Sequence, residues 1–201
     1  MIQKLIFISF SAFILGSIPF GVIISRTVSG IDITKHGSGN IGATNVSRSL
    51  GNKWGLLTLI LDFLKGFIPV YICQRIFNWP EISFLIVGLA SFVGHQFSIF
   101  LKFHGGKGVS TAFGVFTAIS PFTAFIAIIL FSVIVYWSGF VSLASIITVS
   151  ASPIILLMED APTVYILGGV TMAAFICLKH KDNIQRLIRG EEMRLGEKTV
   201  K

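Results

Sequence analysis

The residues best suited to chemistry lie in three short polar segments of an otherwise apolar chain. The first segment, KHGSGNIGATNVSR at residues 35–48, combines glycines, hydroxyls, amides and cations, and no carboxylate lies between Asp32 and Asp62. Glycines let the backbone approach a ligand, and successive backbone N–H groups form concavities that bind anions. Arg48 adds a planar, bidentate donor that suits phosphate. An ordinary Gly-rich turn is the alternative interpretation. We expect an anion site with ligands from Ser38, Gly39, Asn40, Gly42, Thr44, Asn45 and Arg48.

The second segment, GHQFSIFLKFHGGKGVSTAFG at residues 94–114, is similar to a phosphate-binding turn that opens a helix. The free N–H groups of a helix N-terminus bind anions, and Lys107 supplies a cation beside them. The spacing differs from that of the P-loop, so the segment does not predict a nucleotide site. His95 is either a buried hydrogen-bonding group or a catalytic one. The candidate ligands here are Gly105, Gly106, Lys107, Gly108, Ser110 and Thr111.

The third segment, CLKHKDNIQRLIRGEE at residues 177–192, places His180, Asn183 and Arg186 at steps of three. Residues three apart share one face of a helix, so the row predicts a polar helix face just past the membrane. Glu192 is expected to orient the cations of this row. An amphipathic segment that lies on anionic lipid is the alternative interpretation.

Asp62 and Lys65 form an i, i+3 pair inside an apolar run. Ionisable residues within a membrane are costly and usually face the protein interior or a polar cavity. We therefore expect a structural ion pair that supports the first segment. Direct contact with a substrate is the second interpretation.

The elements that must position these segments are membrane-spanning helices. The chain has 201 residues, of which 53% are hydrophobic and 12% are charged, and its mean hydropathy is +0.84. A soluble domain carries about 25% charged residues, so this composition is typical of a polytopic membrane protein. We expect a single all-α domain over residues 1–201. The predicted spans are residues 3–25, 55–77, 81–101, 109–120, 121–137, 139–158 and 162–179.

The distribution of cations predicts the number of spans and their orientation. Lys and Arg gather in cytoplasmic loops, so the formal net charge of +7 needs no nucleic acid to explain it. Seven spans place the first loop, the third loop and the C-terminus on one side, whereas merging the short fourth span with the fifth would split them. We therefore expect Gly-rich loops and a site at the cytoplasmic face, with the N-terminus periplasmic. The C-terminal cations are Lys179, Lys181, Arg186, Arg189, Arg194, Lys198 and Lys201.

The same segments carry a resemblance that covers nearly the whole chain. It rests on GSIPFG, GSGNIGATNVSR, LDFLKG, GHxFSxFLKFxGGKGVST and KHxxNIxRLxxGxE. With these motifs the chain resembles the bacterial membrane acyl-phosphate:glycerol-3-phosphate acyltransferases. His104 departs from the family pattern, in which many relatives have Lys before GGKG.

The resemblance implies a seven-helix enzyme of the bacterial inner membrane. Such an enzyme transfers an acyl chain from acyl-phosphate to the sn-1 hydroxyl of glycerol 3-phosphate, giving lysophosphatidic acid and inorganic phosphate. This is the first acylation of phospholipid synthesis, and a partner enzyme forms the acyl-phosphate.

The residues favour direct transfer without a covalent acyl-enzyme. None of the four His residues begins an H-x-x-x-x-D dyad, and there is no G-x-S-x-G elbow. Ser38 and Lys107 are expected to hold the acyl-phosphate. Glycerol 3-phosphate is expected to bind Arg48, Asn45, His180 and Asn183. The proton of its hydroxyl is expected to go either to a substrate phosphate oxygen or to His180. The catalytic assignments are therefore Ser38, Lys107, His180 and Asn183, with Asp62, Lys65, His95 and Glu192 in support.

The sequence predicts no cofactor and no metal, because Asp and Glu are too few and scattered for a cation cage. A membrane transporter of a phosphorylated solute is the alternative function, since Gly-rich breaks and intramembrane charge suit one. The clustering of the polar residues on one side, away from the midplane, counts against it. An alcohol phosphotransferase is disfavoured because the chain lacks a clustered aspartate motif.

Overall fold

The computed structural model describes residues 1–197, so Lys198 and Lys201 of the predicted basic tail lie outside the described residues. Within this range the chain is entirely helical, as expected. Its elements are α1 (Ile2–Ser17), α2 (Phe20–Ser29), η1 (Ile33–Lys35), α3 (Ala43–Leu50), α4 (Asn52–Ile76), α5 (Glu81–Gln96), η2 (Ile99–Leu101), α6 (Val109–Ile119), α7 (Pro121–Ser138), α8 (Val141–Met158), α9 (Thr163–Lys179) and α10 (Lys181–Arg189).

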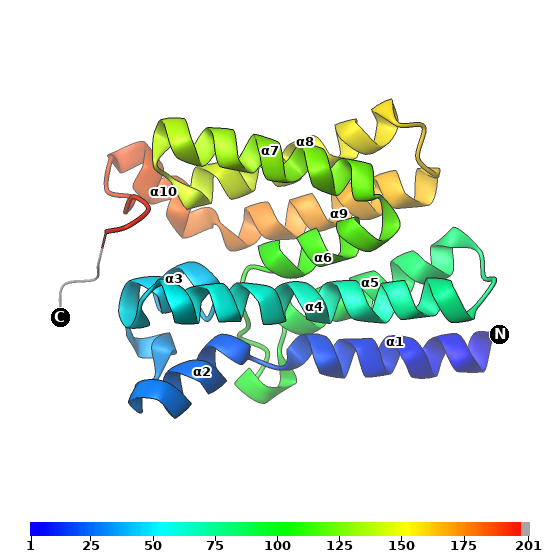
Figure 1. The fold of residues 1–201 in the computed structure, drawn as a ribbon, viewed down its shortest axis with the longest axis horizontal. Helices are drawn as coiled ribbons and strands as arrows, with labels where there is room; N and C mark the ends of the chain where they lie inside the picture. The colour runs from blue at the N-terminus through cyan, green and yellow to red at the C-terminus, as the bar shows by residue number, and fades with distance from the viewer. Residues whose placement is uncertain (198–201) are drawn as a thin grey trace.

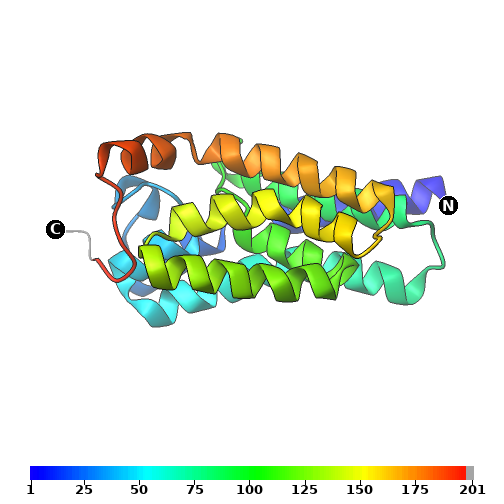
Figure 2. The same ribbon diagram turned by 90° about the horizontal axis from the view of Figure 1, so that it is seen from above.

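The long helices run side by side in two groups that meet at α6. Helices α1, α4 and α5 form one group, and α7, α8 and α9 form the other (Figure 1). Helix α1 packs on α5, α4 packs on α6, and α8 packs on both α7 and α9. The short helices α2, α3 and α10 gather at one end of the bundle, opposite the start of α1 (Figures 1 and 2). The three polar segments of the sequence therefore lie at a common end.

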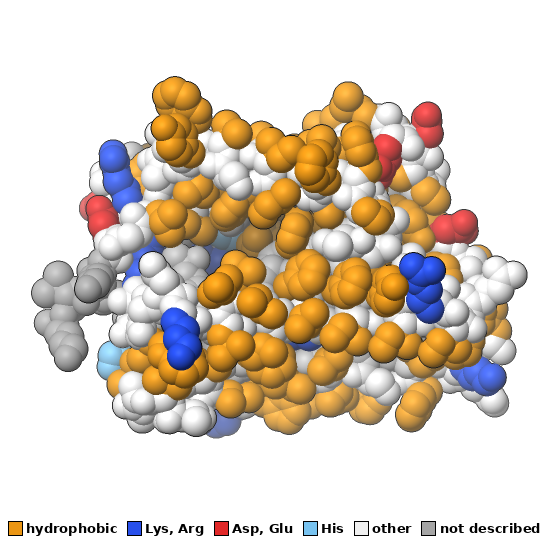
Figure 3. Space-filling view, viewed as in Figure 1, with side chains coloured by type: hydrophobic (Ala, Val, Ile, Leu, Met, Phe, Trp, Pro, Cys, Tyr) orange, Lys and Arg blue, Asp and Glu red, His pale blue; other side chains and the backbone are white. Residues whose placement is uncertain are grey.

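The outer surface fits a lipid environment. Apolar side chains cover most of the lateral face, and charged side chains lie toward its two ends (Figure 3). Among residues 1–197, five helical stretches are long and apolar enough to cross a membrane, or six if the bent pair α9 and α10 is one span. Helix α6 has 11 residues and spans about 16 Å, less than the hydrocarbon core of about 30 Å. The predicted count of seven spans stays a prediction.

Two helix boundaries differ from those predicted, and both differences shape the site. The predicted span 3–25 breaks at Ile18–Pro19, where Lys65 Nζ donates a 3.0 Å hydrogen bond to the Ile18 carbonyl. The predicted span 81–101 ends as a helix at Gln96. The chain then turns back through Lys102 and Phe103, whose φ values are 51° and 64°. This reversal returns the Gly-rich segment to the end of α5.

Helices α4 and α6 touch backbone to backbone. A Cβ atom added to Gly66 would lie 2.1 Å from the Thr111 carbonyl oxygen, and one added to Gly114 would lie 2.2 Å from that of Phe63. Small residues permit such close approach between membrane helices. Because α6 is fixed to α4, the N-terminus of α6 is fixed as well.

The ion pair predicted for Asp62 and Lys65 is present and almost fully buried. Lys65 Nζ lies 2.9 Å from Asp62 Oδ1, and His95 Nδ1 lies 3.7 Å from the same oxygen. The Ser91 hydroxyl donates to the Lys65 carbonyl at 2.6 Å. These contacts join the break after α1 to α4 and α5, directly behind the cationic end of the bundle.

The ion pair leads to a stability prediction. Asp62→Ala leaves a buried ammonium without its partner and should lower the free energy of unfolding by about 3–5 kcal/mol. The double variant Asp62→Leu with Lys65→Met removes both charges. Its free energy of unfolding should be closer to that of the wild type than the free energy of either single variant. Denaturant unfolding in detergent measures this, with the exposed Lys4→Ala as control. A double variant less stable than both singles would contradict the prediction.

Candidate active site

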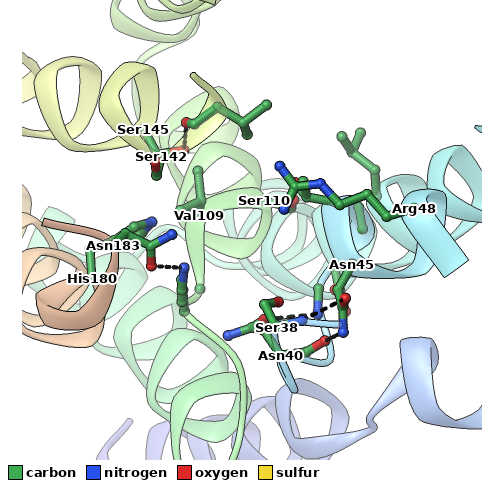
Figure 4. A pocket seen from close by; sticks show the side chains of 18 of the residues that line it. Ser38, Asn40, Asn45, Arg48, Val109, Ser110, Ser142, Ser145, His180 and Asn183 are labelled. Carbon is green, nitrogen blue, oxygen red and sulfur yellow. Dashed lines mark hydrogen bonds between the residues drawn. The ribbon is translucent and has the colours of Figure 1, made fainter. Parts of the chain in front are cut away.

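A polar cavity of about 160 Å³ brings residues from the three predicted segments together. Ser38, Asn45 and Arg48 lie on one side of it, His180 and Asn183 face them, and Ser142 and Ser145 of α8 complete the wall (Figure 4). The predicted site and support residues that line the cavity are Ser38, Asn40, Gly42, Thr44, Asn45, Arg48, Asp62, His95, Lys107, Gly108, Ser110, His180, Asn183 and Glu192.

The first segment is organised by one amide side chain. Asn45 Nδ2 donates to the carbonyls of His36 and Asn40, each at 2.9 Å, and Asn45 Oδ1 accepts from the Ser38 N–H at 3.1 Å. Asn45 is also 2% exposed. Both ends of its amide therefore fold the loop, and its expected contact with substrate stays a prediction.

The second segment rests on the end of α5. The N–H groups of Gly105 and Gly106 donate to the carbonyls of Gln96 and His95 at 3.2 and 3.1 Å. A Cβ atom on Gly105 would lie 2.0 Å from the His95 carbonyl oxygen, which belongs to the backbone, so only glycine fits there. These two N–H groups donate within the protein, and the expected role of Gly105 and Gly106 at a phosphate stays a prediction.

Gln96 is a residue that the sequence interpretation missed. Its side chain is fully buried, and Nε2 donates a 2.8 Å hydrogen bond to the Lys107 carbonyl. It thereby fixes the backbone that carries the Lys107 ammonium. The available signal was an amide inside an apolar run, directly after His95 and near the Gly-rich turn.

Helix α6 presents its N-terminus to the cavity. It begins after Gly108, whose φ of 84° favours glycine, and no side chain caps it. The first N–H groups of a helix have no partner within it, so those at Val109 and Ser110 remain available to an anion. Both residues line the cavity (Figure 4).

The third segment surrounds Glu192. One carboxylate oxygen accepts 2.7 Å hydrogen bonds from Ser142 Oγ and Asn183 Nδ2, and the other accepts from Arg186 Nε at 2.7 Å. Burial opposes the charge, but these hydrogen bonds lower the pKa of Glu192 overall. Because Glu192 engages the amide nitrogen of Asn183, Asn183 Oδ1 is left to accept from Lys107 Nζ.

His180 lies at the junction of the last two helices. It is the N-cap of α10 and precedes the helix, so the predicted row of three on one helix is corrected to a cap followed by two helical residues. Its Nδ1 lies 2.8 Å from the Ile176 carbonyl. A carbonyl only accepts, so Nδ1 carries the hydrogen and Nε2 of the neutral ring is an acceptor.

The Arg48 guanidinium contacts the C-terminal segment and also lines the cavity. Its Nη2 donates to the Met193 carbonyl at 2.9 Å. Its Nε is buried, and no hydrogen-bond partner for it is found among residues 1–197. The unpaired donor gives this guanidinium spare capacity for an anionic ligand.

Some predicted site residues do not line the cavity. The Thr111 hydroxyl donates to the Asp62 carbonyl at 2.9 Å, so Thr111 joins α6 to α4, and its expected role as a ligand stays a prediction. Lys65 and Gly106 lie behind the cavity wall. Gly39, Gly105 and Arg186 line a neighbouring basin instead.

An apolar groove of about 130 Å³ continues from the cavity along the membrane helices. Val109 and Ser110 line both spaces, and Phe113, Phe116 and Val149 line the groove alone. The polar cavity, with Arg48 and Lys107 in its wall, therefore adjoins an apolar groove. Among residues 1–197, no group of three or more His, Cys, Asp or Glu side chains is placed to hold a metal ion. The expected independence from metals stays a prediction.

Known proteins are similar to this chain in sequence and in fold. The family model described as glycerol-3-phosphate acyltransferase matches residues 6–190. The chain belongs to this family. The glycerol-3-phosphate acyltransferase of Geotalea daltonii is 45% identical over 90% of this chain and 92% of its own length. That of Aquifex aeolicus is 41% identical over 96% of this chain and 100% of its own.

Solved structures agree with the family assignment. The crystal structure of PlsY (YgiH), an integral membrane glycerol 3-phosphate acyltransferase in its glycerol 3-phosphate form, matches with a TM-score of 0.92 and 41% identity. It covers 96% of each chain, and the lysophosphatidic acid form gives a TM-score of 0.89. Together with its apolar helices, this likeness identifies a multi-pass membrane protein of the PlsY type.

The buried lysine predicts a pH dependence for anion binding. Burial lowers the pKa of Lys107 to about 8, and Glu192 partly opposes the shift. Below this pH the ammonium is charged and attracts phosphate, and above it the charge is lost. The affinity for inorganic phosphate should therefore fall as pH rises through about 8. Calorimetric titration at several pH values measures it.

Matched variants identify the group that titrates. Lys107→Arg keeps its charge at high pH and should lose the alkaline fall. Lys53→Arg, at an exposed position in the first turn of α4, should keep it. An unchanged fall in Lys107→Arg would assign the titration to another group.

Proposed function

We propose that this protein transfers an acyl chain from an acyl-phosphate to the sn-1 hydroxyl of glycerol 3-phosphate. The products are lysophosphatidic acid and inorganic phosphate, and the reaction is the first acylation of phospholipid synthesis. The observation that carries the proposal is the junction at Val109 and Ser110, where the polar cavity, with Arg48 and Lys107 in its wall, adjoins the apolar groove. An acyl-phosphate has the same two parts, a charged phosphate joined to a long hydrocarbon chain.

The likeness to the PlsY crystal structures supports the acceptor and the product. Those structures are of a glycerol 3-phosphate form and a lysophosphatidic acid form, at 41% identity to this chain. The acyl-phosphate donor is our inference from the groove and from the absence of a nucleophile elbow. In the cell it requires a partner enzyme that makes acyl-phosphate.

The two substrates fit different parts of the cavity. The acyl chain would lie in the groove, with its phosphate at the N-terminus of α6 beside Lys107 and Ser38. Glycerol 3-phosphate would lie deeper among the polar groups, with its phosphate on Arg48 and its hydroxyls near His180 and Asn183. Holding both reactants together replaces most of the covalent chemistry that another acyltransferase would need.

The reaction is a direct displacement at the carbonyl carbon. The sn-1 oxygen of glycerol 3-phosphate forms a bond to this carbon, and the bond from the carbon to the phosphate oxygen breaks. The phosphate leaves with the electron pair. The proton of the hydroxyl goes to a substrate phosphate oxygen or to His180 Nε2. Lys107 and the N–H groups of α6 stabilise the charge that develops on the leaving phosphate.

The site would lie at the cytoplasmic face of the bacterial inner membrane, with the N-terminus periplasmic. Tyr136 and Trp137, which are 83% and 81% exposed, lie at the end of α7 nearest the site. Exposed aromatic residues of this kind mark the boundary between lipid and water. A lipid-borne donor and a soluble acceptor meet at such a boundary. A transporter is not favoured, because family and site both point to acyl transfer.

The donor assay tests the proposed function. Purified protein in detergent, given palmitoyl-phosphate, should release phosphate only when glycerol 3-phosphate is added, in equal amounts with lysophosphatidic acid. Palmitoyl-CoA should not replace the donor. Lys107→Ala should fold and lose nearly all turnover, because the cation at the leaving phosphate is gone. Lysophosphatidic acid formed from palmitoyl-CoA, or full turnover in Lys107→Ala, would contradict the proposal.

A further inference from the structure

A second polar space, which we call the outer basin, lies beside the cavity. It has a volume of about 450 Å³ and is bounded by residues 34–41, residues 101–107 and the junction of α9 with α10. Ser38, Asn40, Lys107 and Asn183 line both spaces, so they form a common wall. The hydrogen bond from Lys107 to Asn183 lies in this wall.

The outer basin is cationic in its own right. Lys102, Lys179 and Arg186 line it and not the cavity, whereas Asp182 is its one carboxylate among the described residues. Lys179 Nζ lies 4.8 Å from the ring centroid of Phe97, a cation–π contact that restricts the ammonium. Arg186 is held by Glu192 from behind. With Lys107 in the common wall, cations outnumber the carboxylate by four to one.

We propose that the outer basin is a second anion site, which holds the phosphate group of glycerol 3-phosphate or of inorganic phosphate outside the reaction cavity. The inference rests on the proposed function, because that function requires two water-soluble phosphates to enter and leave. The ligand class is a small phosphate anion or phosphate monoester. The Lys107–Asn183 hydrogen bond separates this site from the cavity, and Lys107 can reach an anion on either side.

The surroundings of the cavity favour this route. One side opens onto the apolar groove, which a charged solute does not enter. Another side is crossed by the C-terminal segment, where Arg48 binds the Met193 carbonyl and the Leu195 N–H donates to the Gly139 carbonyl at 2.7 Å. The polar outer basin shares a further wall with the cavity. Because the outer basin is lined mainly by cations, it raises the local concentration of an anionic solute beside the cavity.

A charge-matched pair of double variants tests the proposal. Lys102→Gln with Lys179→Gln removes two cations of the outer basin. Lys181→Gln with Arg189→Gln removes two exposed cations of α10 that line neither space. The measurements are calorimetric binding of inorganic phosphate, and the KM for glycerol 3-phosphate and for palmitoyl-phosphate at low and high salt. Thermal unfolding checks that each variant is folded.

The basin variant should bind phosphate about tenfold more weakly at low salt and raise the KM for glycerol 3-phosphate by a similar factor. Turnover at saturation and the KM for palmitoyl-phosphate should stay at their wild-type values. Added salt should reduce the differences in phosphate affinity and in the KM for glycerol 3-phosphate. The control variant should stay close to wild type. Equal losses of phosphate affinity in both variants would show an effect of general surface charge and contradict the proposal. Unchanged phosphate affinity in both variants would also contradict it.

Failure of the proposed function is separable from failure of the outer basin. Phosphate binding can be measured without turnover. If the wild type shows no acyl transfer, but the basin variant still binds phosphate more weakly than the wild type, the proposed function fails and the second anion site stands. A folded basin variant with lost turnover and unchanged KM would overturn the site, because these lysines would then act in the reaction itself.

Discussion

Three hydrogen bonds hold the Gly-rich segment against the end of α5, and the position of Lys107 depends on them. Gly105 and Gly106 donate to α5 carbonyls, and the Gln96 amide donates to the Lys107 carbonyl. Near the membrane such backbone groups have little water to bind, so leaving them unpaired would cost several kcal/mol each. The segment therefore has one stable arrangement, in which its lysine and the start of α6 face the cavity.

Charge is balanced on both sides of this segment. Behind it, the buried Asp62–Lys65 pair joins α4 to the break after α1, with His95 beside it. In front of it, Glu192 orients Asn183 toward Lys107 and anchors Arg186. Asp62, Lys65 and Glu192 thus have partners, whereas the buried Arg48 Nε has none among residues 1–197 and remains available to an anion. This arrangement is what an enzyme needs when its substrates bring the reactive group and the negative charge with them.

The sequence predicted which segments meet, and the structure added which way their side chains point. Cation sidedness was enough to place three distant segments at one end, because lipid permits few other arrangements. The direction of Thr111 was not predictable, since it depends on the close contact of α6 with the backbone of α4. The backbone contacts of Asn45 and Gln96 were not predictable for a related reason. Whether an amide binds ligand or backbone depends on carbonyls that come from distant turns.

In the proposed reaction the acyl group passes directly between two phosphate-bearing substrates. A rapid-quench experiment with protein in excess over palmitoyl-phosphate tests this direct transfer. Without glycerol 3-phosphate, we expect intact palmitoyl-phosphate and no palmitate bound to protein. Adding glycerol 3-phosphate should then give lysophosphatidic acid in one phase. A burst of phosphate equal to the palmitoyl-phosphate added, with palmitate on Ser38 or another side chain, would contradict direct transfer.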